Sequence, residues 1–276
     1  MNDAVLNRAV LNRAVVNDAK PSVMRVREIG VSALKGGRHR PRTRIALSAL
    51  GPVGDRVFAV VDLADGRVLK TVEHPSLVGC DARWQCGVLS ISIDGQQISG
   101  TPTTDATPLT LDYWGRPVSM RNVRGPWSPA FSRLLGRPVA LARVDFPGEV
   151  VYGDTVTLAT TSSLERLARE SGTPVDPRRF RSTFTIDTGE ADAHLEDCWA
   201  GRELEVGGAR LLVGAGIPRC AVIDLDPHTG ARGAGLLKIL ADYRLDSGEI
   251  MFGVYARVVR PGLVGRGDPV RLLPAP

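Results

Sequence analysis

Short β-type segments separated by glycine-containing turns recur along most of this chain, and they restrict the folds that it can form. Residues 88–94 (VLSISID) alternate apolar and polar side chains and stop at Gly95. Ala64-Asp65-Gly66 and Gly115-Arg116 each stand between two such segments, as the turn of a β-hairpin does. Many short strands at this spacing are typical of small barrels and sandwiches. The strands expected in the first half of the chain are 24–32, 56–62, 67–72, 88–94, 109–114 and 117–123, with one short helix at 129–135.

The second half of the chain mixes strands with helices. Ser162-x-x-Glu165 has the pattern of a capping box, which predicts a helix that starts at Ser162 and stops at Gly172. A second helix is expected over residues 235–243. These patterns predict a mainly β (α+β) fold, with a β-barrel that carries helices on its rim. The strands expected here are 183–187, 210–213, 220–225, 249–259 and 270–273.

A stretch rich in proline and glycine, residues 125–148, marks a seam between two parts. We expect an N-terminal β-barrel-like domain over residues 24–145 and a second domain over residues 146–276. Residues 1–23 repeat AVLNR, AVLNR and AVVND, and a period of five fits neither a helix nor a strand. This segment is therefore predicted to be a disordered or non-native extension, with Met24 as the functional start.

Several classes of protein are excluded by what the sequence lacks. The chain has no apolar run of membrane-spanning length and no signal-type N-terminus, so a cytoplasmic protein with no membrane partner is expected. Its four cysteines include no Cys-x-x-Cys pair and no ferredoxin-type run. P-loop, dinucleotide-binding and nucleophile-elbow motifs are absent. The net charge of +5 suits an anionic ligand, but the basic stretches lack the interleaved aromatic residues of a nucleic-acid surface, so none is expected as a partner.

Cys220 is the thiol with the most suggestive surroundings. It follows Arg219 directly, and a neighbouring cation lowers the pKa of a thiol and favours the nucleophilic, metal-binding thiolate. From the residues alone, a buried structural cysteine is the ordinary interpretation.

Three basic features are candidates for anion binding. Lys35-Gly36-Gly37 would let the backbone approach an anion beside the Lys35 ammonium group. Arg178-Arg179-Phe180-Arg181 would grip a phosphate, and Gly54-Asp55-Arg56 would orient Arg56 through Asp55. A plain turn, a solvated charged loop and a structural ion pair are the respective alternatives.

Taken in order, these features resemble the MOSC superfamily, which is named after the C-terminal domain of the molybdenum cofactor sulfurase. The resemblance covers nearly all of residues 24–273 and is to the two-part members with an N-terminal β-barrel, which include the amidoxime-reducing component and its bacterial relatives. The motifs that carry it are Lys35-Gly36, Gly54-Asp55-Arg56-Val57-Phe58, Ser163-Leu164, Arg179-Phe180-Arg181, Trp199-x-Gly201, Arg219-Cys220, Asp226-Pro227-x-Thr229-Gly230, Phe252-Gly253-x-Tyr255 and Gly267-Asp268-x-Val270.

The resemblance implies a molybdenum cofactor, with Cys220 as the catalytic thiolate and as the protein ligand of the metal. It assigns Lys35, Arg56 and Arg181 to the phosphate and pterin of that cofactor. Ser162 and Ser163 would contact it from a helix N-terminus, where free N–H groups attract anions. The remaining cofactor-binding residues that it implies are Gly36, Arg179, Thr183, Arg219 and Tyr255.

Two positions depart from the family pattern. Arg181-Ser182-Thr183 replaces the usual Arg-Pro-Asn, so a hydroxyl stands in place of an amide. Val72-Glu73-His74-Pro75 replaces an Arg-Gln pair before proline, which removes one cation.

Three functions are compatible with the resemblance. The first is an oxidoreductase that reduces N-hydroxylated or other N/S-oxygenated small molecules with electrons from a separate flavin or iron–sulfur protein. The second is a sulfur carrier or sulfurtransferase that uses a Cys220 persulfide, and the third is a non-catalytic cofactor carrier. Pyridoxal phosphate is not expected, because the sulfurase domain that binds it has no counterpart in this chain.

Overall fold

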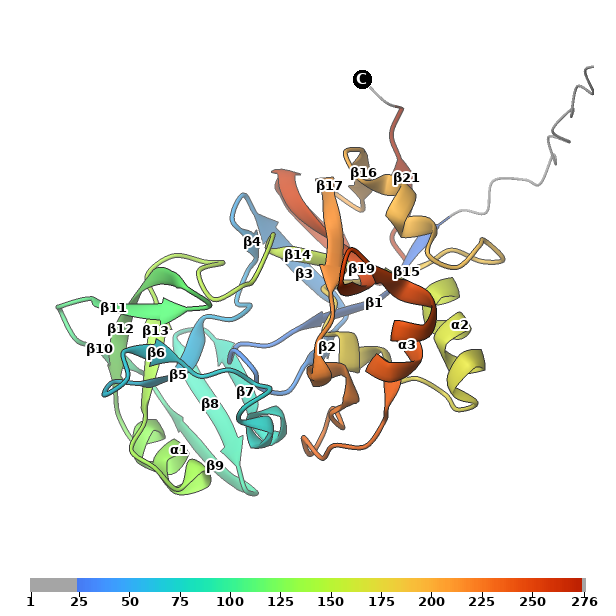
Figure 1. The fold of residues 1–276 in the computed structure, drawn as a ribbon. Coiled ribbons are helices and arrows are strands. Elements are labelled where there is room, and N and C mark those ends of the chain that lie inside the picture. Colours follow the sequence, from blue (N-terminus) through green and yellow to red (C-terminus); the bar gives the residue numbers. More distant parts are fainter. Residues whose placement is uncertain (1–23, 275–276) are drawn as a thin grey trace, which may run out of the picture.

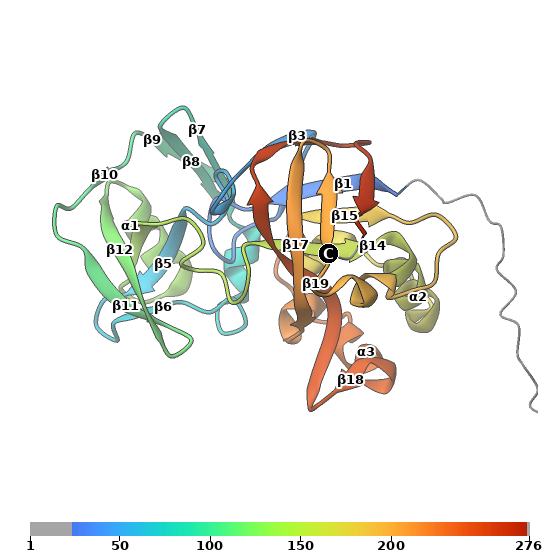
Figure 2. The same ribbon diagram turned by 90° about the horizontal axis from the view of Figure 1, so that it is seen from above.

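A computed structural model describes residues 24–274 as two β-rich lobes that lie side by side (Figures 1 and 2). The predicted extension, residues 1–23, lies outside the described residues. The mainly β fold expected from the sequence is confirmed, since strands dominate both lobes and three α-helices are found within residues 24–274.

The first lobe is built on a closed barrel of five strands, β12-β11-β6-β5-β13, in which β13 pairs again with β12. All five residues of β5 are buried, and their alternation sends Ala59 and Val61 into one core and Phe58 and Val60 into another. The barrel strands are β5 (Phe58–Asp62), β6 (Arg67–Val68), β11 (Leu109–Tyr113), β12 (Arg116–Arg124) and β13 (Ala140–Val144).

The core that receives Phe58 and Val60 lies between the barrel, a three-stranded meander and helix α1 (Trp127–Leu135). Trp127 and Phe131 on the buried face of α1 fill this core, and Gly136 ends the helix in a left-handed conformation. The other elements of the lobe are η1 (Pro75–Gly79), β7 (Asp81–Gln85), β8 (Val88–Ile93), β9 (Gln96–Gly100) and β10 (Thr103–Thr104).

The second lobe is a strongly curved sheet of nine strands around a single apolar core. Backbone hydrogen bonds from Val26 to Asp268 and from Val270 to Met24 link its first strand to its last, so that the sheet closes on itself. The sheet strands are β1 (Arg25–Val31), β2 (Arg40–Arg42), β14 (Val156–Thr160), β15 (Phe184–Asp187), β16 (Glu203–Val206), β17 (Ala209–Pro218), β18 (Leu245–Asp246), β19 (Glu249–Arg260) and β21 (Val270–Leu272).

The N-terminal strands do not stay with the first lobe. Strand β1 pairs with β15, and β3 (Arg44–Ser48) pairs with β4 (Gly51–Pro52) and with β20 (Gly262–Gly265). The chain therefore crosses between the lobes more than once. The division at residues 145/146 stays a prediction. The pairing shows a strand exchange between the lobes, in which the N-terminal strands β1 and β3 pair with strands from the second half of the chain.

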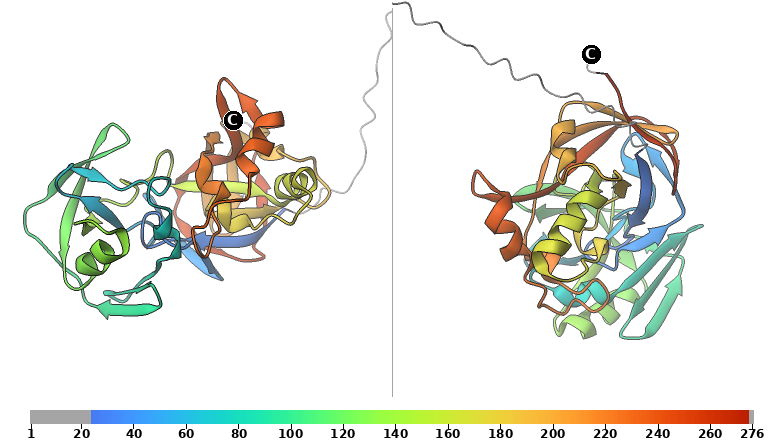
Figure 3. Two further views of the ribbon diagram at one scale, coloured as in Figure 1. Left: turned by 60° about the horizontal axis from the view of Figure 1, so that its bottom comes forward. Right: turned by 90° about the vertical axis from the view of Figure 1, so that its right-hand side faces the viewer.

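Two helices pack on the second barrel, and α2 (Thr161–Ser171) lies at the end turned away from the first lobe (Figure 3). Leu164 and Leu167 of α2 share an apolar cluster with Leu236 and Leu240 of α3 (Leu236–Arg244). The expected rim helices are therefore present. Three short 3-10 turns complete the lobe: η2 (Pro177–Phe180), η3 (Leu195–Trp199) and η4 (Ala221–Asp224).

Three local predictions are wrong. The strand expected at residues 67–72 is confined to β6 (Arg67–Val68), because residues 71–73 form a turn. Residues 220–225 are not a strand, because Ala221–Asp224 forms the 3-10 turn η4, and the carbonyls of Ile223 and Leu225 face the Arg179 guanidinium instead of a neighbouring strand. Helix α2 begins one residue before Ser162. Its cap is the Thr160 hydroxyl, which accepts the Ser163 N–H, so the predicted capping box is not the one used. No helix within residues 24–274 is long and apolar enough to cross a membrane.

Candidate functional site

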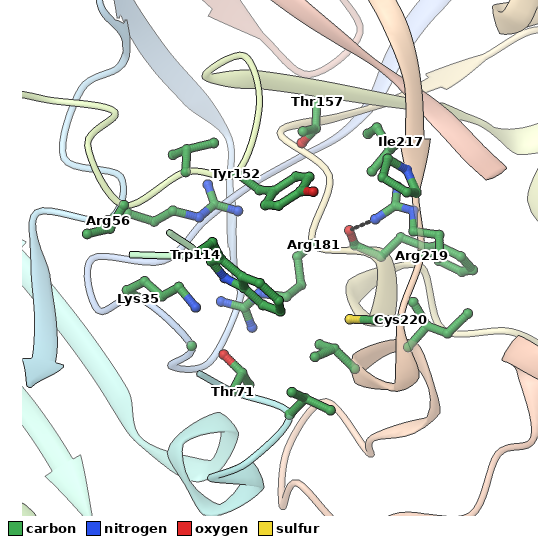
Figure 4. A pocket seen from close by; sticks show the side chains of 18 of the residues that line it. Lys35, Arg56, Thr71, Trp114, Tyr152, Thr157, Arg181, Ile217, Arg219 and Cys220 are labelled. Carbon is green, nitrogen blue, oxygen red and sulfur yellow. Dashed lines mark hydrogen bonds between the residues drawn. The ribbon is translucent and has the colours of Figure 1, made fainter. Parts of the chain in front are cut away.

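A cavity of about 370 Å³ lies where the two lobes meet, and both lobes contribute to its walls (Figure 4). Eight of the residues predicted from the sequence line it: Lys35, Gly36, Arg56, Arg179, Arg181, Arg219, Cys220 and Tyr255. The strand exchange between the lobes brings these residues together.

Lys35 and Arg56 reach the cavity because two of the crossing segments pair with each other. The Arg56 N–H donates to the Ser32 carbonyl at 2.6 Å, and the Lys35 N–H donates to the Phe58 carbonyl at 2.7 Å. Gly36 follows with φ +80°, and a Cβ at that position would lie 2.6 Å from Thr71 Oγ1. A side chain at position 36 would therefore clash with Thr71, and glycine is the residue that fits there.

Arg181 enters the cavity from the second lobe. The turn η2 is capped by the Asp176 carboxylate, and Arg181 follows it in a left-handed conformation with φ 54°. Its Nη2 atom is buried and has no hydrogen-bond partner. Figure 4 shows the head groups of Lys35 and Arg181 directed into the same space.

Repulsion and burial act together on this cluster of cations. Burial, followed by the charges of Arg181 and Arg56, lowers the pKa of Lys35 to about 7. Burial and the Arg56 charge lower the pKa of Arg181 to about 10. Arg56 forms an ion pair with Asp55, whereas Glu249, an exposed residue, is the sole carboxylate among the residues that line the cavity. The cavity therefore favours an anionic ligand.

Cys220 stands on the wall formed by the second lobe, as the cap residue of η4. It is exposed, so the alternative of a buried structural cysteine is wrong, and Figure 4 shows its sulfur directed into the cavity. Cys80, by contrast, is buried, and burial raises the pKa of its thiol to about 12. Within residues 24–274 no group of three His, Cys, Asp or Glu side chains could hold a metal ion by itself.

Two arginines hold the Cys220 wall in place. Arg219 donates through Nε to the Phe252 carbonyl at 2.8 Å and through Nη1 to the Phe180 carbonyl at 2.9 Å. Its Nη2 is buried without a partner, and burial lowers its pKa to about 10. Arg179 donates to the Leu225 carbonyl at 2.6 Å and so fixes η4. Arg219 thus keeps one donor free for a ligand, whereas Arg179 is engaged by the protein itself.

Three predicted residues do not line the cavity. Ser163 donates its hydroxyl to the Glu196 carboxylate at 2.8 Å, and Ser162 accepts a hydrogen bond from Thr188 and donates to the Asp192 carbonyl. The N-terminus of α2 therefore faces a carboxylate of the protein. Thr183 is buried behind the cavity, where its hydroxyl accepts the backbone N–H of Thr157.

The structure adds residues that sequence analysis missed. Trp114 and Tyr152 line the cavity from two different segments, and their rings meet edge to face with centroids 5.8 Å apart. They are 45% and 61% exposed, which is unusual for large aromatic side chains. The ammonium group of Lys70 lies 4.2 Å from the Trp114 ring centroid. The one signal for Trp114 in the sequence is its place in the Trp114-Gly115-Arg116 hairpin turn.

Comparisons with known proteins agree with the motifs. Residues 153–271 match the family model of the MOSC domain. A stretch of 81 residues is 35% identical to the molybdenum cofactor sulfurase of Solanum lycopersicum, and it covers 29% of this chain but 9% of that protein.

Two solved structures align with the chain at low sequence identity. The YUAD protein from Bacillus subtilis aligns over 90% of this chain and 94% of its own, with 10% identity and a TM-score of 0.43. YiiM from Geobacillus stearothermophilus aligns over 44% of this chain and 54% of its own, with 17% identity and a TM-score of 0.33. The family match assigns residues 153–271 to the MOSC domain family, and the ordered motifs of that part of the chain agree with it.

Proposed function

We propose that the cavity between the lobes binds the molybdenum cofactor, and that the protein reduces N-hydroxylated or other N/S-oxygenated small molecules. One observation carries the proposal: half-buried arginines, each with a buried N–H group that has no partner, line a single cavity together with an exposed thiol. Such a cavity suits a ligand that combines a phosphate with a thiophilic metal.

The residues present fit this cofactor. Lys35, Arg56 and Arg181 would hold the phosphate, because guanidinium and ammonium groups are its usual protein partners. Cys220 would bind the metal, since a soft thiolate suits molybdenum. With no three-residue metal cluster within residues 24–274, the other metal ligands would come from the cofactor. Arg219 Nη2 and the Thr157 hydroxyl offer further polar contacts on the same wall.

When bound, the cofactor supplies a metal that exchanges electrons and accepts oxygen. The net reaction, R₂N–OH + 2 e⁻ + 2 H⁺ → R₂NH + H₂O, consumes two protons and two electrons. The exposed ring faces of Trp114 and Tyr152 at the cavity would bind and orient a flat substrate. Because the chain carries no flavin or iron–sulfur motif, the proposal includes a separate protein as the electron donor.

Metal analysis of the purified protein tests the proposal. Wild-type protein made in cells that produce the cofactor and are supplied with molybdate is expected to contain molybdenum and to reduce an N-hydroxylated compound with an artificial reductant. Cys220→Ala should lose the activity, while the matched variant Cys198→Ala, which removes another exposed thiol, should keep it. Metal-free wild-type protein from those cells would contradict the proposal. Retained cofactor without turnover would favour a carrier.

Sulfur transfer through a Cys220 persulfide is the second candidate. It is supported by the exposed thiol in the cavity and by the 81-residue identity with a protein named as a molybdenum cofactor sulfurase. Intact-protein mass spectrometry after incubation with a cysteine desulfurase and free L-cysteine should then find one added sulfur in the wild type and none in Cys220→Ala. A mass that stays unchanged would exclude this function.

A further inference from the structure

A second cavity, of about 510 Å³, lies in the second lobe behind the wall that carries Arg181. It is bounded by β1, by β2 and by the segment that joins α2 to η2. Apolar groups of Ile29, Pro41, Pro174 and Val175 form much of its lining. None of the residues assigned to the cofactor lines it, so this cavity needs its own explanation.

Two polar side chains in this lining are almost fully buried. Ser182 is 5% exposed, and its Oγ atom has no hydrogen-bond partner. His39 is 7% exposed, and its ring lies so close to Gly30 that a Cβ there would overlap it. Burial, with the charges of Arg181 and Arg56, holds the pKa of His39 well below its usual range, so the ring is neutral. A buried hydroxyl without a partner is costly, which points to a ligand that supplies one.

Cations surround these two groups. Arg42, Arg178 and Arg266 line the cavity, and Arg178 is bound to the Asp176 carboxylate. No carboxylate within residues 24–274 forms an ion pair with Arg42 or Arg266. Arg266 donates a hydrogen bond through Nε to the Arg27 carbonyl at 3.2 Å. Glu28 is the other acidic residue of the lining. Both unpaired guanidinium groups are therefore available to an oxyanion.

The second cavity is separate from the first. A small gap of about 10 Å³ shares His39 and Arg178 with the second cavity, and it shares Arg179, Arg181 and Val222 with the first. Such a gap holds at most one water molecule. The two neighbouring residues Arg181 and Ser182 belong to different cavities, since Arg181 lines the first and Ser182 lines the second.

We propose that this second cavity binds a small organic molecule that carries a carboxylate or phosphate group. The oxyanion would pair with Arg42 and Arg266 and accept a hydrogen bond from the Ser182 hydroxyl, while the apolar part would lie against the proline-rich wall. The site does not depend on the cofactor or on Cys220.

Titration calorimetry of the full chain with benzoate and with phenyl phosphate tests this proposal. These probes share the apolar ring and differ in the oxyanion, so their relative affinities identify which group the site prefers. The double variant Arg42→Gln/Arg266→Gln should weaken binding of the preferred probe at least tenfold, and Ser182→Ala should weaken it roughly threefold to tenfold. The matched control is Lys70→Met, which removes a cation beside Trp114 of the first cavity and does not line the second, so it should leave this affinity unchanged.

The folded state must be checked in the same variants. Ser182→Ala should melt at or above the temperature of the wild type, because the hydroxyl that it removes has no partner in the protein. Failure of both probes to bind below about 10 mM would overturn the proposal. So would binding that Lys70→Met weakens and the double variant leaves intact, since the first cavity would then be the site.

Discussion

Two regions of the second lobe concentrate hydrogen-bond donors. In one region the donors have an acceptor within the protein, and in the other they do not. At the N-terminus of α2, the hydroxyls of Thr160 and Ser163 donate to the carboxylate of Glu196, which is fully buried. At the cavity between the lobes, Arg181 and Arg219 each keep a buried N–H group without a partner. One region contains its own anion, and the other lacks one.

Whether a buried donor has a partner within the protein distinguishes structural polar groups from groups that are available to a ligand. Both regions contain residue types that anion sites use, and the family resemblance implied that both contact the same cofactor. The α2 terminus is satisfied within the protein, so its donors stabilise the fold. The donors of the cavity have no partner in the protein, and buried donors in folded proteins are usually completed by a protein group, an ordered water molecule or a ligand.

Removing the Glu196 carboxylate is expected to have the largest effect on stability. Glu196→Ala leaves the Thr160 and Ser163 hydroxyls without their acceptor and opens a space in the interior, so the free energy of unfolding should fall by about 3 kcal/mol. Urea denaturation measures this change. Glu196→Gln keeps the volume and one acceptor oxygen, and it should lose less. A loss below about 1 kcal/mol for Glu196→Ala would show that the carboxylate is not needed there.

Removing a cation from the cavity should change the free energy of unfolding in the opposite direction. Arg181→Met takes away a buried charge whose Nη2 has no partner, so the ligand-free protein should gain about 1–2 kcal/mol while losing affinity for sulfate. The matched variant Arg56→Met should lower stability, because it leaves the buried Asp55 carboxylate unpaired. Urea denaturation of both variants, without added anion, provides the comparison. A loss of stability in Arg181→Met would mean that the arginine is structural.

The contrast between the two regions could be predicted from the sequence only in part. The β-rich, barrel-type fold follows from strand patterns. A common site for Lys35, Arg56 and Cys220 was implied only by the resemblance to the MOSC superfamily. That Ser163 faces a carboxylate does not follow from the sequence, because Glu196 lies 33 residues further on and no local rule joins the two. The strand expected at 220–225 failed for a similar reason, since the distant Arg179 engages the carbonyls that a strand would use.

The charge of Lys35 should make anion binding in the first cavity depend on pH. Its pKa of about 7 lies below the ordinary value for lysine, so between about pH 7 and 10.5 the unfolded chain binds more protons and the ligand-free protein becomes more stable as pH rises. An anion favours the charged form, so the affinity for sulfate should fall roughly tenfold per pH unit above 7. Calorimetry of the wild type against Lys35→Met measures this dependence. A pH slope that persists in Lys35→Met would assign it to another group.

The smallest expected effect bears most directly on the contrast between the two regions. Ser163→Ala removes one donor to Glu196 but keeps the Thr160 cap, so it should cost about 1 kcal/mol of stability. Because Ser163 does not line the cavity, this variant should keep the sulfate affinity and the molybdenum content of the wild type. Denaturation, calorimetry and metal analysis of one preparation cover all three. A fall in metal content with stability preserved would show that the N-terminus of α2 contributes to the cofactor site. A fall in stability alone would show that its role is structural.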